Sequence, residues 1–122
     1  MLIRQINWFG GWGLVLLAFV TGAGIGLFFH HDNFLGGYTS WSRRMLRLGH
    51  IAMAALGILN VVYSLAPIAG PAAGLTLLAG AIAMPALCFA SAWKQPLRVF
   101  FFIPVSLLAI AVILILTSGA HP

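Results

Sequence analysis

One histidine lies alone in an apolar stretch of the chain, and it is the first candidate for chemistry. His50 follows Arg43 by seven positions. If a membrane boundary lies near Arg43, a rise of 1.5 Å per residue places His50 about 10 Å inside the lipid. An ionisable side chain at that depth indicates a functional site. Neutral imidazole commonly ligates haem iron, so His50 is the candidate cofactor-binding residue, as an axial ligand of haem b or of a chlorophyll-type pigment.

The other apolar segments bring residues with suitable chemistry to a similar depth. Counted from the nearest basic residues, Cys88 and Pro104 lie about 9 Å deep and Met84 about 15 Å deep. Residues 21–26 read TGAGIG, and glycines allow a flat macrocycle or another backbone to approach closely. A haem or pigment pocket needs parts of this kind.

The same residues have a purely structural interpretation, which stays open. Gly22 and Gly26 form a small-xxx-small pair, which is common where membrane helices pack together. Cys88 is small enough to serve as buried packing. A neutral His50 can instead form a hydrogen bond to a backbone carbonyl group or to another subunit.

His30, His31 and Asp32 form a second polar group, about 10 Å shallower than His50. That separation is too great for either histidine to share a haem with His50. A metal ion at the interface needs more carboxylates or thiolates than Asp32 alone supplies. We therefore expect solvated histidines here and predict no metal site in the chain.

The elements that position these residues are four long apolar segments. Residues 8–29, 48–66, 71–93 and 99–118 are each close to the roughly 20 residues that a membrane-spanning helix needs. The connections are short, with Ser40 among the candidate N-caps of the second helix and Pro71 suited to the start of the third. We predict an all-α integral membrane protein with one transmembrane domain over residues 1–122, built as an up-down-up-down bundle of four helices.

One face of the second predicted helix carries small or polar residues. His50, Gly57 and Ser64 follow one another at a spacing of seven, and Asn60 lies slightly around the helix from them. An amide in lipid is expected to find a partner on another helix. This face is therefore predicted to pack against protein.

Basic residues predict the orientation in a cell (inner) membrane. The connections at 30–47 and 94–98 hold five of the six Lys and Arg residues, whereas Arg4 lies on the other side. Cytoplasmic loops carry the excess of Lys and Arg, so both connections are predicted to be cytoplasmic and both termini outside. Tryptophans near each boundary fit anchoring at the interfaces: Trp8, Trp12, Trp41 and Trp93.

Composition narrows the class of function. Hydrophobic residues make up 62% of the 122 residues and charged residues 6%. The lipid bilayer is therefore the predicted surrounding, and the net charge of +5 follows from scattered basic residues rather than a nucleic-acid-binding patch. Asp32 is the one carboxylate side chain. The catalytic motifs of hydrolases and transferases are missing, so the chain is not expected to be an enzyme. No Asp, Glu, Lys or Arg lies within a predicted span, which argues against a coupled transporter.

Three functional hypotheses follow. The first is a non-catalytic accessory subunit of a larger electron-transfer or photosynthetic membrane complex, which packs against other membrane subunits through small-residue helix faces and the first cytoplasmic connection. The second is a haem b- or chlorophyll-binding membrane protein with His50 as ligand. The third is a small oligomeric pore or transporter for a neutral solute, because four helices enclose little volume without oligomerisation.

Overall fold

The computed structural model describes residues 2–66 and 70–118, and these residues form helices joined by short connections. In chain order the elements are α1 (Leu2–Phe29), the 3₁₀ helix η1 (Phe34–Gly36), α2 (Trp41–Leu65), α3 (Pro71–Trp93), the 3₁₀ helix η2 (Gln95–Phe101) and α4 (Phe102–Thr117). The described residues contain no strand. Four of the helical segments are long and apolar enough to cross a membrane, with α4 counted together with η2.

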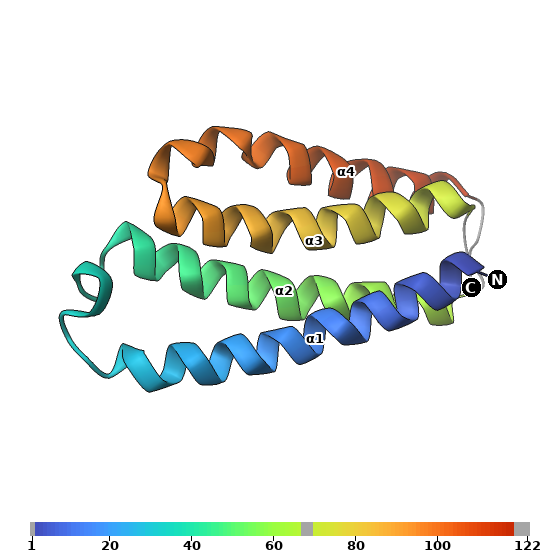
Figure 1. The fold of residues 1–122 in the computed structure, drawn as a ribbon. Helices are drawn as coiled ribbons and strands as arrows, with labels where there is room; N and C mark the ends of the chain where they lie inside the picture. Colours follow the sequence, from blue (N-terminus) through green and yellow to red (C-terminus); the bar gives the residue numbers. More distant parts are fainter. Residues whose placement is uncertain (1, 67–69, 119–122) are drawn as a thin grey trace.

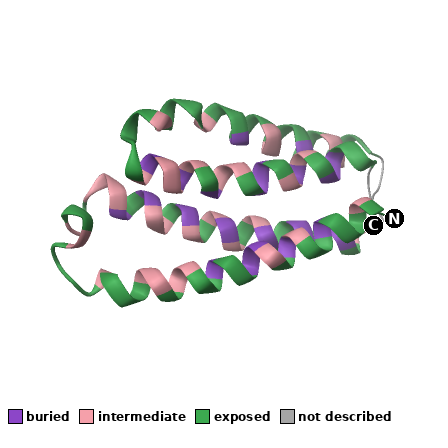
Figure 2. Cartoon of the chain, in the orientation of Figure 1, coloured by how far each residue is buried: buried purple, intermediate pink, exposed green. Residues whose placement is uncertain are grey.

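Consecutive long helices lie side by side and run in opposite directions (Figure 1). The central pair is α2 and α3, with α1 packed on one side and α4 packed on α3 at the other. One buried cluster joins α1, α2 and α3 through Leu14, Ala18, Met53 and Ala81. A second buried cluster joins α2, α3 and α4. Figure 2 shows that α4 is exposed along most of its length. The flanking helices therefore have the largest unburied faces.

The first two long helices begin earlier than the apolar segments indicate. Helix α1 begins at Leu2 rather than at residue 8, and α2 begins at Trp41 rather than at residue 48. The Ser40 side chain accepts a hydrogen bond from the backbone N–H of Arg43 at 3.3 Å and so caps α2. Hydropathy finds the part of a helix that lipid surrounds, whereas the helix itself continues into polar sequence.

The connection before α2 contains a reversal that two glycines permit. Gly36 and Gly37 have φ values of 86° and 95°, and Leu35 before them has a φ of 51°. Glycine adopts such angles without the steric cost that a Cβ atom brings. Gly36 and Gly37 therefore permit the change of direction between α1 and α2.

Prolines set the start of the later helices. Pro71 occupies the first turn of α3 after the N-cap Gly70. The sequence also predicts a short turn over residues 67–70 before this helix, and of these only Gly70 belongs to the described residues. Residues 99–101, predicted as α-helix, instead belong to the 3₁₀ helix η2. Pro104 explains the late start of α4 at Phe102, because proline has no N–H to donate to the carbonyl group four residues earlier.

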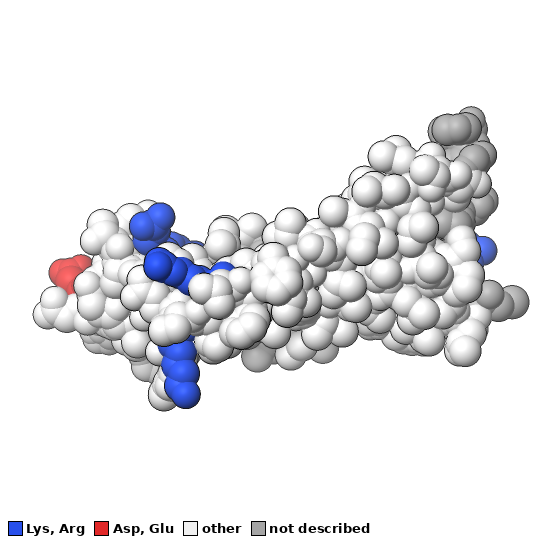
Figure 3. Space-filling view, turned by 90° about the horizontal axis from the view of Figure 1, so that it is seen from above, with Lys and Arg blue, Asp and Glu red and all other residues white. Residues whose placement is uncertain are grey.

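The basic side chains gather at the end of the molecule that carries both predicted cytoplasmic connections (Figure 3). Arg43, Arg44 and Arg47 lie in the first two turns of α2, and Lys94 and Arg98 lie between α3 and α4. Arg4 lies at the other end, in the first turn of α1. The antiparallel helices thus separate five basic residues from one.

Candidate functional site

The face of α2 that carries His50, Gly57 and Ser64 packs against α1. A Cβ atom added to Gly22 would lie 2.6 Å from Cε1 of His50. One added to Gly11 would lie 2.6 Å from the carbonyl oxygen of Gly57, so the two backbones touch. The carbonyl oxygen of Ser64 accepts a hydrogen bond from Nε of Arg4 at 2.8 Å. These contacts confirm that this face packs against protein, and the protein is the chain's own first helix.

His50 is half-buried, and its imidazole edge lies over the glycine backbone of α1. Nδ1 lies 3.4 Å from Oγ1 of Thr21. That hydroxyl group donates its proton to the carbonyl oxygen of Leu17 at 2.8 Å, so toward His50 it acts as an acceptor. In the tautomer that carries its proton on Nδ1, the ring donates to this hydroxyl group and Nε2 keeps its lone pair. His50 therefore joins α2 to α1, with one ring nitrogen engaged.

Cys88 lies at the level of His50 but on another side of α2. A Cβ atom on Gly49, the neighbour of His50, would lie 2.9 Å from the Cβ of Cys88 and from the ring of Phe89. Cys88 is fully buried at this contact. This contact agrees with the similar depths predicted for Cys88 and His50. However, His50 faces α1, whereas Cys88 packs from α3 against α2. His50 meets Gly22 and Thr21 of α1, and in the described part of the chain no hydrogen bond joins it to Cys88, Met84 or Pro104. Around Gly24 and Gly26 a Cβ atom would meet nothing within 4 Å.

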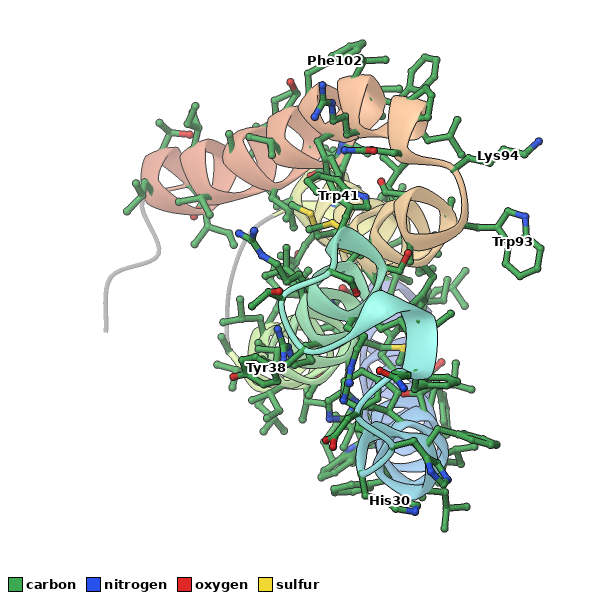
Figure 4. The ribbon with its side chains drawn as sticks, turned by 90° about the vertical axis from the view of Figure 1, so that its left-hand side faces the viewer. His30, Tyr38, Trp41, Trp93, Lys94 and Phe102 are labelled. Atoms are coloured by element: carbon green, nitrogen blue, oxygen red, sulfur yellow. The ribbon has the colours of Figure 1, made fainter. Side chains whose placement is uncertain are left out.

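His30 and His31 lie beyond the end of α1, where both are exposed. Their ring centroids are 4.0 Å apart with an angle of 38° between the planes. His30 lies at the edge of the molecule, away from α3 and α4 (Figure 4). Within residues 2–66 and 70–118, no three His, Cys, Asp or Glu side chains are grouped so that they could hold a metal ion.

Sequence reasoning missed the role of the first turn of α2, which joins three helices. Trp41 Nε1 donates to the carbonyl oxygen of Ser91 at 2.9 Å, and Ser42 Oγ donates to that of Ala92 at 2.8 Å, both at the end of α3. On the other side, the guanidinium group of Arg43 donates to the carbonyl oxygens of Phe29 and His31, at 2.6 and 3.3 Å. The last carbonyl groups of a helix lack partners within the helix. The start of α2 therefore satisfies the ends of both neighbours.

Aromatic rings reinforce this end of the molecule. The guanidinium carbon of Arg43, which is only 3% exposed, lies 4.3 Å from the centroid of the Phe29 ring. Arg47 lies over Tyr38 at 4.2 Å. Trp41 lies among the helices whereas Trp93 points outward, as Figure 4 shows. Of these two tryptophans, Trp93 alone keeps the exposed position that the interfacial-anchor prediction requires, since Trp41 is used in helix capping.

Two buried asparagines form side-chain hydrogen bonds within their own helices. Asn60 is fully buried, and its Nδ2 donates at 2.8 Å to the carbonyl oxygen of Leu56 in the same helix. Asn7 does the same with Ile3 at 2.9 Å. Their Oδ1 atoms have no hydrogen-bond partner among the described residues. The expectation of an interhelical partner for Asn60 is therefore wrong for its amide nitrogen, because a carbonyl group one turn earlier lies within reach.

Comparison of the chain with protein-family models, curated proteins and solved structures found no match. A functional interpretation must therefore come from the chain's own geometry. That geometry consists of a glycine-lined α1–α2 interface, a capping turn at the basic end and two flanking helices with large exposed faces.

Proposed function

We propose that the chain is a non-catalytic accessory subunit that packs against other subunits within a membrane. In this proposal the helices cross the bilayer up, down, up and down, with the connections at 30–47 and 94–98 in the cytoplasm. The four apolar helices and the gathering of basic residues at one end support this placement.

The observation that carries the proposal is the difference between two groups of glycines. Several glycines are filled by contacts within the chain, as Gly11 is by Gly57 and Gly22 is by His50. In contrast, a Cβ atom on Gly13 or Gly24 would meet nothing within 4 Å. Membrane helices use small residues where another backbone approaches closely. Open glycines on an outer helix therefore indicate a helix of another chain.

Gly13 and Gly24 share one face of α1. They are 11 residues apart, which is about three helical turns. Val20 lies between them on the same face and is 61% exposed. The buried residues of α1 all lie between Asn7 and Ala18, so none lies in the part of the helix after Ala18. This face, which we call the Gly13–Gly24 face, supports docking of a partner helix.

Electron-transfer and photosynthetic complexes are the assemblies to examine first. The chain places little mass outside its helices, which suits a subunit that fills gaps, seals cofactors from lipid and holds partners in register. Identifying the partner in its native membrane would decide between these two classes of complex.

Photo-cross-linking in the native membrane tests the proposal. A benzophenone amino acid at Val20 should yield an adduct with a different membrane protein, identified by mass spectrometry. The same probe at Ile58, which is 54% exposed on α2, is the control for random encounters. Gly24→Leu should abolish the adduct, because its side chain fills space that the chain itself leaves open.

Gly26→Leu is the matched control for this experiment. Gly26 is also open, but two residues along a helix turn its face by about 200° from that of Gly24. The adduct should survive this change. An adduct with lipid alone, an adduct with only a second copy of this chain, or equal effects of the two leucines would contradict the proposal.

Ligation of haem b or a chlorophyll-type pigment by His50 is the second candidate function. The pairing of Nδ1 with Thr21 favours it, because ligating histidines usually hold the other ring N–H in a hydrogen bond. Protein purified from cells that make these cofactors should then show visible absorption that His50→Ala removes. A colourless folded preparation would exclude this function.

A further inference from the structure

The end of the molecule opposite the basic connections holds a pocket. It lies where the first turns of α1 meet the last turn of α2, and Arg4, Gln5, Trp8, Phe9 and Ser64 line it. Its volume is about 450 Å³, within the range of about 300–1,000 Å³ typical of small-molecule sites. The lining combines one cation and one amide with two aromatic rings. Such a pocket suits a ligand with a charged head and an apolar body.

Arg4 is held so that its charged group can receive an anion. Its Nε donates to the carbonyl oxygen of Ser64 at 2.8 Å, which fixes one edge of the guanidinium group. The hydroxyl group of Ser64 is engaged elsewhere, donating to Val61 at 2.6 Å. Among the described residues the two terminal nitrogens of Arg4 have no hydrogen-bond partner. A guanidinium group presents paired N–H donors that match two oxygens of a phosphate.

The aromatic residues place this cation at the level of lipid headgroups. Tryptophan rings collect at membrane interfaces, and Arg4 precedes Trp8 by four residues, or about 6 Å toward the water. Trp12 packs edge-on against Trp8 at 5.9 Å and is 50% exposed, so it continues the apolar wall toward the bilayer interior. An acyl chain would therefore run beside these rings from a phosphate at Arg4.

We infer that this pocket binds the headgroup of an anionic phospholipid in the leaflet opposite the basic connections, with its phosphate on Arg4. Arg4 is the sole Lys or Arg in the chain before residue 43, so charge complementarity at this end depends on one side chain. A zwitterionic lipid carries a choline that offsets the phosphate. The pocket should therefore prefer phosphatidylglycerol to phosphatidylcholine.

Quenching of Trp8 fluorescence by brominated lipid tests this preference. The variant with Trp12→Phe, Trp41→Phe and Trp93→Phe keeps Trp8 as its one tryptophan and is reconstituted in phosphatidylcholine vesicles. A minor fraction of brominated phosphatidylglycerol should quench Trp8 as strongly as about a fivefold larger fraction of brominated phosphatidylcholine, as expected for one basic residue near the headgroups. Arg4→Gln should remove the difference, and Arg4→Lys should keep part of it.

Arg98→Gln is the matched control, because it removes the same charge at the other end and should leave the preference unchanged. Native mass spectrometry of the chain with all four tryptophans should show phosphatidylglycerol retained, and Arg4→Gln should lose it, so the test stands even if the triple variant fails to fold. Equal quenching by the two lipids, a preference that survives Arg4→Gln, or displacement of the lipid by millimolar inorganic phosphate would overturn the inference.

Discussion

The contribution of each glycine in α1 depends on which atoms lie beside its Cα atom, where another residue would carry a Cβ atom. Gly11 faces the carbonyl oxygen of Gly57 and the backbone nitrogen of Val61, at 2.6 and 2.9 Å from an added Cβ atom. Backbone atoms cannot rotate away as a side chain can. Gly11→Ala should therefore push α1 from α2 and lower the free energy of unfolding by about 1–3 kcal/mol, as overpacking does. Unfolding in mixed detergent micelles measures this change.

Gly13→Ala is the control, since nothing lies within 4 Å of its added Cβ atom. Because alanine has a higher helix propensity than glycine, the stability of this variant should be unchanged or slightly greater. Equal loss of stability in both variants would disprove the close α1–α2 contact. The sequence could not separate these glycines, because both lie in one apolar run and only the position of α2 distinguishes them. For the same reason the ring position of His50 over Gly22 was not predictable.

At the scale of the elements, the first turn of α2 stabilises the ends of its neighbours. Arg43 donates to Phe29 and His31, whereas Arg44 beside it is exposed. Arg43→Gln should free these carbonyl groups, at a cost of about 1.5–3 kcal/mol for each hydrogen bond to a charged group. Amide hydrogen exchange should then accelerate in the last turn of α1. Arg44→Gln removes the same charge and should leave that exchange unchanged.

If Arg43→Gln and Arg44→Gln accelerate exchange equally, lost charge rather than lost capping would be the cause. The N-cap Ser40 and the start of α3 at Pro71 were predictable, since such signals act within a few residues along the chain. The capping by Trp41, Ser42 and Arg43 was not. This capping requires the start of one helix to lie beside the ends of two others. In the sequence, Trp41 is equally typical of an interfacial anchor, Ser42 of an N-cap and Arg43 of a topology signal.

For the whole molecule, helix number and alternation follow from apolar length and short connections, but the placement of α4 does not. Its sequence is bulky and apolar on all sides, so no polar face indicates which helix it should contact. In the structure it packs on α3 and leaves most of its surface exposed. Hydrogen bonds from Arg4 and Arg43 link α1 to α2, whereas α4 packs on α3 through apolar residues such as Ala111.

The orientation of the molecule rests on charge at its two ends. Arg43 is buried and engaged in capping, yet without it Arg44, Arg47, Lys94 and Arg98 still outnumber Arg4 by four to one. The charge bias that predicts cytoplasmic connections therefore persists. In a Cys88→Ala background, Asn33→Cys and Gly70→Cys place single thiols at exposed positions near opposite ends. A membrane-impermeant thiol reagent added to intact cells should label Gly70→Cys alone, and permeabilised cells should allow both to react. Labelling of Asn33→Cys in intact cells would contradict the predicted orientation. The pocket at Arg4 would then lie in the cytoplasmic leaflet.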